Sequence, residues 1–145
     1  MRLLSLHCES FRNLERVSIE PHDRFNILEG QNGQGKTNVL EAIYLLGALR
    51  SFREARTKGL IQWDQESALV RGRVSRRGVE RELGVELSSK GRRAVTDGKI
   101  VSRLSDYFGH LHLVVVCPED LHLSKGGPAG RRRVIDRSIF QIVPS

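Results

Sequence analysis

The chain carries a complete phosphate-loop pattern, G-x-x-x-x-G-K-[ST], in the segment Gly30-Gln31-Asn32-Gly33-Gln34-Gly35-Lys36-Thr37. The residues before it, 24–29, predict a short strand, and residues 38–46 predict a helix that Gly47 ends. Strand, glycine-rich loop and helix follow one another in the order that a nucleotide-binding loop requires. We therefore predict a site for a nucleoside triphosphate between this strand and this helix.

Each residue type in the loop has a part in holding phosphate. Glycines let the backbone wrap closely around an anion, and the amide N–H groups and the positive end of the following helix then face it. Lys36 is the side chain expected to reach the β- and γ-phosphates, and the Thr37 hydroxyl is expected to ligate Mg²⁺. We expect residues 30–37, together with Asn38, to bind the nucleotide.

The composition indicates one basic domain. The chain has 145 residues, with 24 Lys and Arg against 17 Asp and Glu, for a net charge of +7. Such a balance favours nucleic acid as a partner, although a solvated basic face gives the same count. Cys8 and Cys117 lie in separate apolar stretches and are expected to be buried thiols, without metal-ligand or disulfide spacing. Without a long apolar run or a signal-peptide pattern, we expect a cytoplasmic protein with no membrane partner.

The order of patterns along residues 1–145 predicts an α/β domain with an antiparallel part. Apolar alternation predicts strands near the N-terminus, and Asp97-Gly98 predicts a hairpin. The expected parts are strands at 3–8 and 17–20, a phosphate-loop unit at 24–47, an antiparallel meander at about 67–101, a short helix at 103–108 with Ser102 as its cap, and a terminal strand and basic helix at 111–141.

Several blocks of the chain resemble the RecF family of recombination-mediator ATPases. They cover both ends of the chain, whereas the meander between them is similar only in its pattern. The resemblance implies an α/β fold, a P-loop NTPase of the ABC type, lobe I, with a mixed sheet around the phosphate loop and an antiparallel β-meander subdomain. The blocks are residues 29–46, Arg50-Ser51-Phe52-Arg53, Pro118-Glu119-Asp120-Leu121, Lys125-Gly126-Gly127-Pro128, Arg131-Arg132, Ile135-Asp136 and Gln141.

The resemblance also implies site residues and partners. Arg12 and Asn13 are expected near the nucleotide and Trp63 beside its base, the alternatives being a surface arginine and a core tryptophan. The expected ligands are ATP and Mg²⁺. In such proteins two subunits form an ATP-dependent homodimer that binds DNA at single/double-strand junctions and works with recombination-mediator proteins in DNA repair, DNA replication and the SOS response.

Two segments near the C-terminus resemble other motifs of ATPases. Residues 123–127 resemble a signature loop, and residues 114–120 resemble a Walker B strand. We interpret neither in that way, because too little chain follows the first, and Cys117-Pro118 separates the second strand from its acids. Glu119 or Asp120 is expected either to assist at the γ-phosphate or to cap a turn.

An arginine cluster, Arg131, Arg132, Arg133 and Arg137, is the DNA-binding candidate, with a solvated ion-pair face as the alternative. No catalytic set is complete, so we expect the N-terminal part of an ATPase head that binds ATP without hydrolysing it efficiently. Two alternatives stay open: a complete small P-loop kinase or nucleotidase, and a nucleic-acid-binding module with a vestigial phosphate loop.

Overall fold

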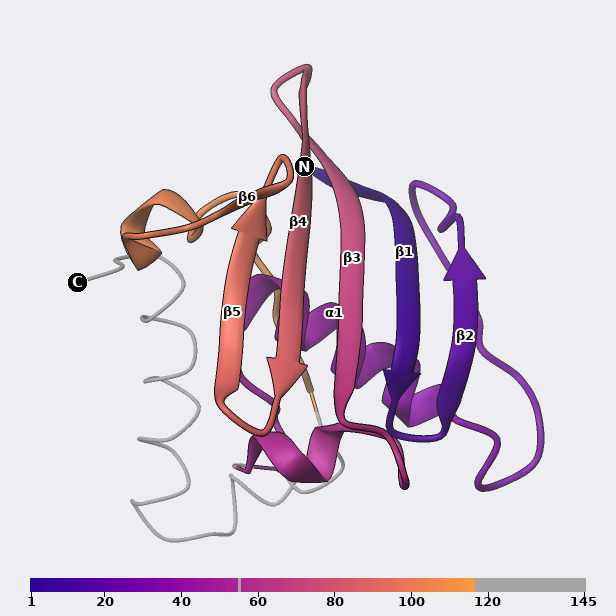
Figure 1. Cartoon of the computed structure of the whole chain (residues 1–145). Coiled ribbons are helices and arrows are strands. Elements are labelled where there is room, and N and C mark those ends of the chain that lie inside the picture. The colour runs from indigo at the N-terminus through magenta and orange to yellow at the C-terminus, as the bar shows by residue number, and fades with distance from the viewer. Residues whose placement is uncertain (55, 117–145) are drawn as a thin grey trace, which may run out of the picture.

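The described residues of the computed structural model, 1–54 and 56–116, form one antiparallel sheet with a helix across one face (Figure 1). Six strands are hydrogen-bonded in the order β2-β1-β3-β4-β5-β6. The predicted meander region corresponds to β3 through β6, each strand pairing with the next. The strands are β1 Arg2–Phe11, β2 Leu14–Ile19, β3 Ser67–Arg76, β4 Val79–Ser88, β5 Gly91–Thr96 and β6 Lys99–Ile100.

The sheet has one apolar face and one charged face, as the alternation of residue types predicts. The helix α1, Lys36–Ala48, lies across one face of the sheet (Figure 1). The buried residues of β1, β3 and β4 form one core cluster with residues of this helix. Cys8 is fully buried among them, as predicted. The core residues contributed by these strands are Leu6, Cys8, Phe11, Ala68, Val70, Val74, Leu83, Val85 and Leu87.

The C-terminal end of α1 is held by two side chains from distant parts of the chain. The guanidinium of Arg92 on β5 donates to the carbonyl of Leu49, where a left-handed residue ends the helix. The buried hydroxyl of Tyr107 donates to the carbonyl of Leu46 over 2.7 Å. A cation at this end also complements the negative end of the helix dipole. These contacts satisfy carbonyls that the helix itself leaves unpaired.

Two predicted strands are not formed. Residues 24–29 and 111–116 have no strand assignment, because no strand among the described residues pairs with either segment. Extended backbone becomes a β-strand only where a neighbour accepts and donates its hydrogen bonds. Some apolar side chains in these segments are exposed, among them Phe25 (86%), Ile27 (81%), Val114 (85%) and Val116 (73%), whereas Leu111 is buried.

Two predicted helix boundaries are also wrong. Gly47 does not end α1 but lies inside it, where Leu111 and Leu113 approach so closely that a Cβ would sit 2.5 Å from a Leu113 methyl group. The short helix expected at 103–108 is reduced to a 3₁₀ turn, Leu104–Asp106, preceded by Arg103 without a side-chain cap. A second 3₁₀ turn, η1 Thr57–Leu60, lies between α1 and β3. None of the described helices is long and apolar enough to cross a membrane.

Candidate nucleotide-binding site

The phosphate loop leads directly into the free N-terminal end of α1. The helix begins at Lys36, and its N-cap residue Gly35 provides no side-chain hydrogen bond to the first turn. No acidic residue lies in that turn either. The first N–H groups of a helix have no partner within it and carry partial positive charge. This end of α1 is therefore open to an anion, as the sequence pattern predicts.

The backbone of the loop has the conformation for which its glycines are needed. Gly30, Gly33 and Gly35 have φ values of 138°, 86° and 97°. A Cβ on Gly35 would lie 2.7 Å from Leu14 Cδ2 and 2.9 Å from Asn13 Oδ1. The turn between β1 and β2 thus touches the loop, and only glycine fits between them.

Lys36 is folded back onto its own loop. Its ammonium donates to the carbonyl oxygens of Gly30 at 2.6 Å and Gln31 at 2.7 Å. The side-chain oxygen of Gln34 accepts a hydrogen bond from the backbone N–H of Gln31 at 3.0 Å. Neutral acceptors therefore hold the lysine, and phosphate oxygens would be stronger acceptors for its charge.

Two asparagines connect the loop to the β1–β2 turn and to α1. Asn13 Nδ2 donates to the carbonyl of Gly33 at 2.7 Å, and its Oδ1 accepts from Asn38 Nδ2 at 2.7 Å. Asn38 Oδ1 in turn accepts from Arg53 Nη1 at 3.0 Å. The structure thus brings Asn13 and Asn38, both predicted site residues, together with the phosphate loop. Arg53 was not among the predicted site residues.

Arg12 is held by a carboxylate inside the protein. Its Nη2 and Nε donate to the two carboxylate oxygens of Glu41 at 2.8 and 3.1 Å, and its Nη1 donates to the carbonyl of Gly59 at 2.6 Å. Glu41 is completely buried, and the Ser51 hydroxyl also donates to it. This grouping joins the β1–β2 turn and α1 to Ser51 and Gly59, which lie between α1 and β3. The described contacts of Arg12 are with protein groups, beside the loop that Asn13 touches.

Sequence reasoning missed Glu41, although the chain contains a signal for it. Glu41 lies between apolar residues in a helix whose buried side also carries Ala42 and Leu45. A charged residue on the buried side of a helix requires a partner of opposite charge. The pattern alone does not identify Arg12 as that partner, because the two residues are 29 positions apart.

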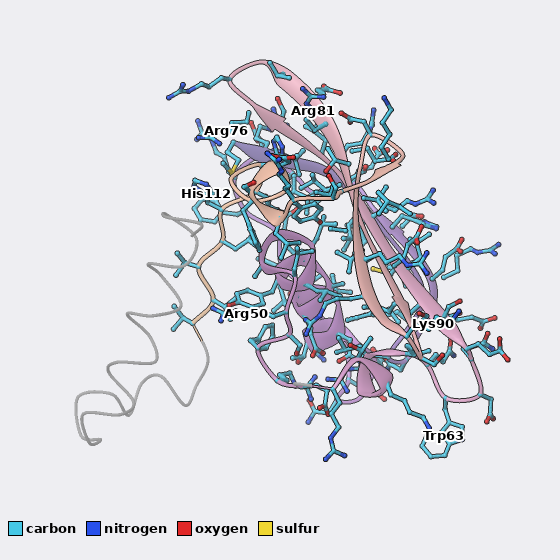
Figure 2. All side chains as sticks on the ribbon, turned by 60° about the vertical axis from the view of Figure 1, so that its left-hand side comes forward. Arg50, Trp63, Arg76, Arg81, Lys90 and His112 are labelled. Carbon is cyan, nitrogen blue, oxygen red and sulfur yellow. The ribbon has the colours of Figure 1, made fainter. Side chains whose placement is uncertain are left out.

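Trp63 is not a core residue, so that alternative is wrong. Its side chain is 88% exposed and projects from the end of the molecule opposite Arg76 and Arg81 (Figure 2). It borders a hollow of about 720 Å³. The backbone N–H of Gln62 donates to the carbonyl of Ser10 at 2.7 Å, so this hollow adjoins the β1–β2 turn that touches the phosphate loop. Its other lining residues are Glu54, Arg56, Lys58, Gly59, Ile61, Asp64 and Gln65.

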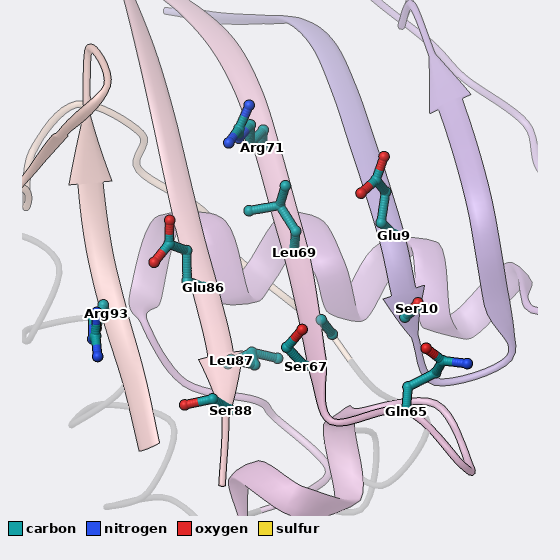
Figure 3. Close-up of a pocket in the computed structure, with 11 residues that line it drawn as sticks. Glu9, Ser10, Gln65, Ser67, Leu69, Arg71, Glu86, Leu87, Ser88 and Arg93 are labelled. Atoms are coloured by element: carbon teal, nitrogen blue, oxygen red, sulfur yellow. The ribbon is translucent and has the colours of Figure 1, made fainter. Parts of the chain in front are cut away.

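The charged face of the sheet has a separate hollow of about 400 Å³, shown in Figure 3. Arginines and glutamates alternate across the strands there: Glu9 on β1, Arg71 on β3, Glu86 on β4 and Arg93 on β5. A hydrogen bond from His7 lowers the pKa of Glu9, with the charge of Arg16 adding to the effect. The mixed charges match a solvated sheet surface better than a site for one anion.

Several predicted residues lie outside the described part of the chain. These are Cys117, Glu119, Asp120 and the arginine cluster, Arg131, Arg132, Arg133 and Arg137. Thr37 lies exposed in the first turn of α1. Among the described residues, no group of three or more His, Cys, Asp and Glu side chains is placed to hold a metal ion. In phosphate-loop sites Mg²⁺ takes ligands from the phosphates of the bound nucleotide as well as from the loop hydroxyl.

Comparison with known proteins identifies the family. Residues 2–107 match the family model described as the RecF/RecN/SMC N terminal domain. This chain belongs to that family. Within it, the chain is 48% identical to the DNA replication and repair protein RecF of Geobacter sulfurreducens, over 97% of this chain and 38% of the relative. It is 46% identical to the RecF of Myxococcus xanthus over 100% of this chain and 38% of that protein.

A solved structure of the recombination mediator protein RecF with ATP is also similar. It aligns with a TM-score of 0.86 and 33% identity, over 99% of this chain and 40% of that one. The similarity confirms the predicted fold class, the lobe of an ABC-type ATPase, and the resemblance to RecF on which it rested. The chain spans about two fifths of the length of these RecF proteins.

Proposed function

We propose that this chain binds ATP, with Mg²⁺, as the phosphate-loop lobe of a RecF-type protein of DNA repair and replication. The observation that carries the proposal is the phosphate loop itself, with three glycines at positive φ, an uncapped helix N-terminus and Lys36 held only by neutral carbonyls. The RecF structure with ATP supports the choice of nucleotide.

Each group at the site has a part in this binding. The N–H groups at the start of α1 and Lys36 neutralise the phosphates, and the Thr37 hydroxyl is the protein ligand for Mg²⁺. We assign the exposed ring of Trp63 to stacking on the base. Asn13 and Arg12 support the site without binding the nucleotide directly, because both already have protein partners that fix their positions.

The wider activity of the protein is part of the same proposal. ATP holds two subunits together as a homodimer, which binds DNA through backbone contacts and assists recombinase loading with mediator proteins in the cytoplasm. The relatives' description as DNA replication and repair proteins supports this reading, as does the net charge of +7. The arginine cluster at 131–137 is the proposed DNA contact.

Hydrolysis requires groups beyond this loop. A residue must orient the attacking water, and a partner must stabilise the transferred charge. We therefore propose that residues 1–145 alone bind ATP but hydrolyse it no faster than background. Adding the remaining part of a RecF head should restore turnover.

The test combines two measurements on the purified chain. Titration with a fluorescent ATP analogue in the presence of Mg²⁺ should show saturable binding, and steady-state assays should detect neither ATP hydrolysis nor phosphate transfer to nucleosides. Robust turnover that Asp120→Asn removes would favour a complete small kinase or nucleotidase. Absence of binding would favour the nucleic-acid module with a vestigial loop.

A further inference from the structure

Glu41 is the only charged residue among those described that is completely buried. Removing a carboxylate from water is unfavourable unless its partners are well placed, and replacing such a pair by apolar residues often stabilises a protein. The ion pair with Arg12 is therefore poorly explained by stability alone. Its position suggests another role, because it joins α1, which follows the phosphate loop, to the β1–β2 turn, which touches that loop.

The contacts of Glu41 lead to the loop in two steps. Both carboxylate oxygens accept from the Arg12 fork, which fixes the backbone at the β1–β2 turn, and Arg12 has a positive φ of 57° there. The next residue, Asn13, donates to the carbonyl of Gly33 at 2.7 Å. A 180° rotation of the Asn13 side-chain amide would break a second hydrogen bond, because Asn38 donates to the amide oxygen at 2.7 Å.

The bond from Asn13 controls the direction of an N–H group in the phosphate loop. The C=O and N–H of one trans peptide point in opposite directions. With the Gly33 carbonyl held toward Asn13, the N–H of Gln34 must point away from it. Anion-binding loops depend on such N–H groups being aligned before the anion arrives. The contact of Asn13 and Leu14 with Gly35 fixes the same turn sterically.

We infer that Glu41 is a positioning residue for triphosphate binding, which acts through Arg12 and Asn13 on the peptide between Gly33 and Gln34. This rests on the proposed ATP binding and adds to it a residue that does not touch the ligand. Ser51 extends the unit, because its hydroxyl donates to Glu41 and accepts from the backbone N–H groups of Arg53 and Glu54, each at 2.8 Å.

A double-mutant cycle tests the inference on the whole chain, with ATP affinity and thermal unfolding measured for the wild type, Glu41→Gln, Asn13→Ala and the double variant. Glu41→Gln should weaken ATP binding about tenfold, because the new amide N–H faces the donors of Arg12. In the Asn13→Ala background the same change should have little effect. An equal loss in both backgrounds, or no loss in the wild-type background, would overturn the inference.

Tyr107→Phe separates positioning from stability. This change removes a buried hydrogen bond at the other end of α1, so it should lower the melting temperature without changing the ATP affinity of the folded chain. If it weakened ATP binding as much as Glu41→Gln, the inference would fail.

Arg12→Lys provides a second route if Glu41→Gln does not fold. Lysine keeps a positive charge beside Glu41 but cannot also reach Gly59 with the same fork. It should weaken ATP binding in the wild-type background and have little effect in the Asn13→Ala background, and equal losses in both would contradict the inference. A wild-type chain that did not bind ATP would instead refute the proposed function.

Discussion

The ammonium of Lys36 lies 2.6 Å from the carbonyl oxygen of Gly30, six residues before it. The lysine thus closes the loop that it follows, using hydrogen bonds to neutral acceptors. A triphosphate offers charged oxygens in their place, and the attraction between opposite charges adds to each hydrogen bond what a neutral carbonyl cannot provide. Ligand binding and loop closure therefore compete for the same ammonium.

Lys36→Ala should abolish measurable ATP binding while the chain stays folded. Lys36 is a half-buried residue at the start of α1 and not part of the core, so the far-UV circular dichroism spectrum should not change. Fluorescent-nucleotide titration measures the loss. Lys90→Ala is the matched control, because Lys90 is exposed in the turn between β4 and β5. Undiminished affinity in Lys36→Ala would refute the phosphate-loop assignment.

Gly35→Ala should destabilise the chain and also remove ATP binding. Alanine at φ 97° is strained by about 1–2 kcal/mol, and its Cβ would in addition collide with Leu14 and Asn13. Gly78→Ala is the control, with a φ of 81° in a hairpin turn and no atom within 4 Å of the new Cβ. Urea unfolding should show the larger loss for Gly35→Ala, and only that variant should lose nucleotide affinity. Equal effects of the two variants on stability and on nucleotide affinity would contradict the close contact of Gly35 with Leu14 and Asn13.

The free energy of unfolding should fall at alkaline pH partly because of Cys8. Burial raises the pKa of its thiol from 9.0 to about 12. The folded state therefore keeps a proton that the unfolded state loses, so this contribution is intact below pH 9.0 and disappears as the pH rises toward 12. Cys8→Ala should flatten the decline in urea-unfolding free energy between about pH 8 and about pH 10. If the unfolding free energies of the wild type and of Cys8→Ala fell in parallel with pH, Cys8 would have no part in the alkaline loss of stability.

DNA binding should fall steeply with salt and depend little on sequence. Arginines without interleaved aromatic residues contact phosphates, and each phosphate contact releases counterions. Binding to unrelated duplexes across a salt series measures the slope. Replacing Arg131, Arg132 and Arg133 with glutamine should reduce that slope by about one for each lost phosphate contact. A flat salt response would favour the solvated ion-pair face.

Local sequence patterns correctly predicted the features that depend only on residues close together in the chain. The glycine spacing and Lys36 predicted the loop, the alternation of apolar residues predicted the meander strands, and the apolar setting of Cys8 predicted its burial. These features follow from backbone freedom and from a period of two along a strand.

The same reasoning was wrong at 24–29 and 111–116 because a strand also needs a hydrogen-bonded neighbour, and no local pattern provides one. It was wrong at Gly47 because a glycine inside a helix can serve close packing, here against Leu111 and Leu113, instead of ending the helix. Distant residues decided the outcome at Gly47, and the lack of a pairing strand among the described residues decided it at 24–29 and 111–116.

The sequence by itself determined that this chain has a loop able to hold phosphate, since eight consecutive residues contain all the groups involved. Only the tertiary structure decided how that loop is held. The bonds from Asn13 to Gly33, from Asn38 to Asn13 and from Arg12 to Glu41 join residues 20, 25 and 29 positions apart. Such pairs are brought together only when the β1–β2 turn packs against the loop and α1. Burial of Glu41 then requires the charge of Arg12, whereas the two asparagine bonds lie at the surface.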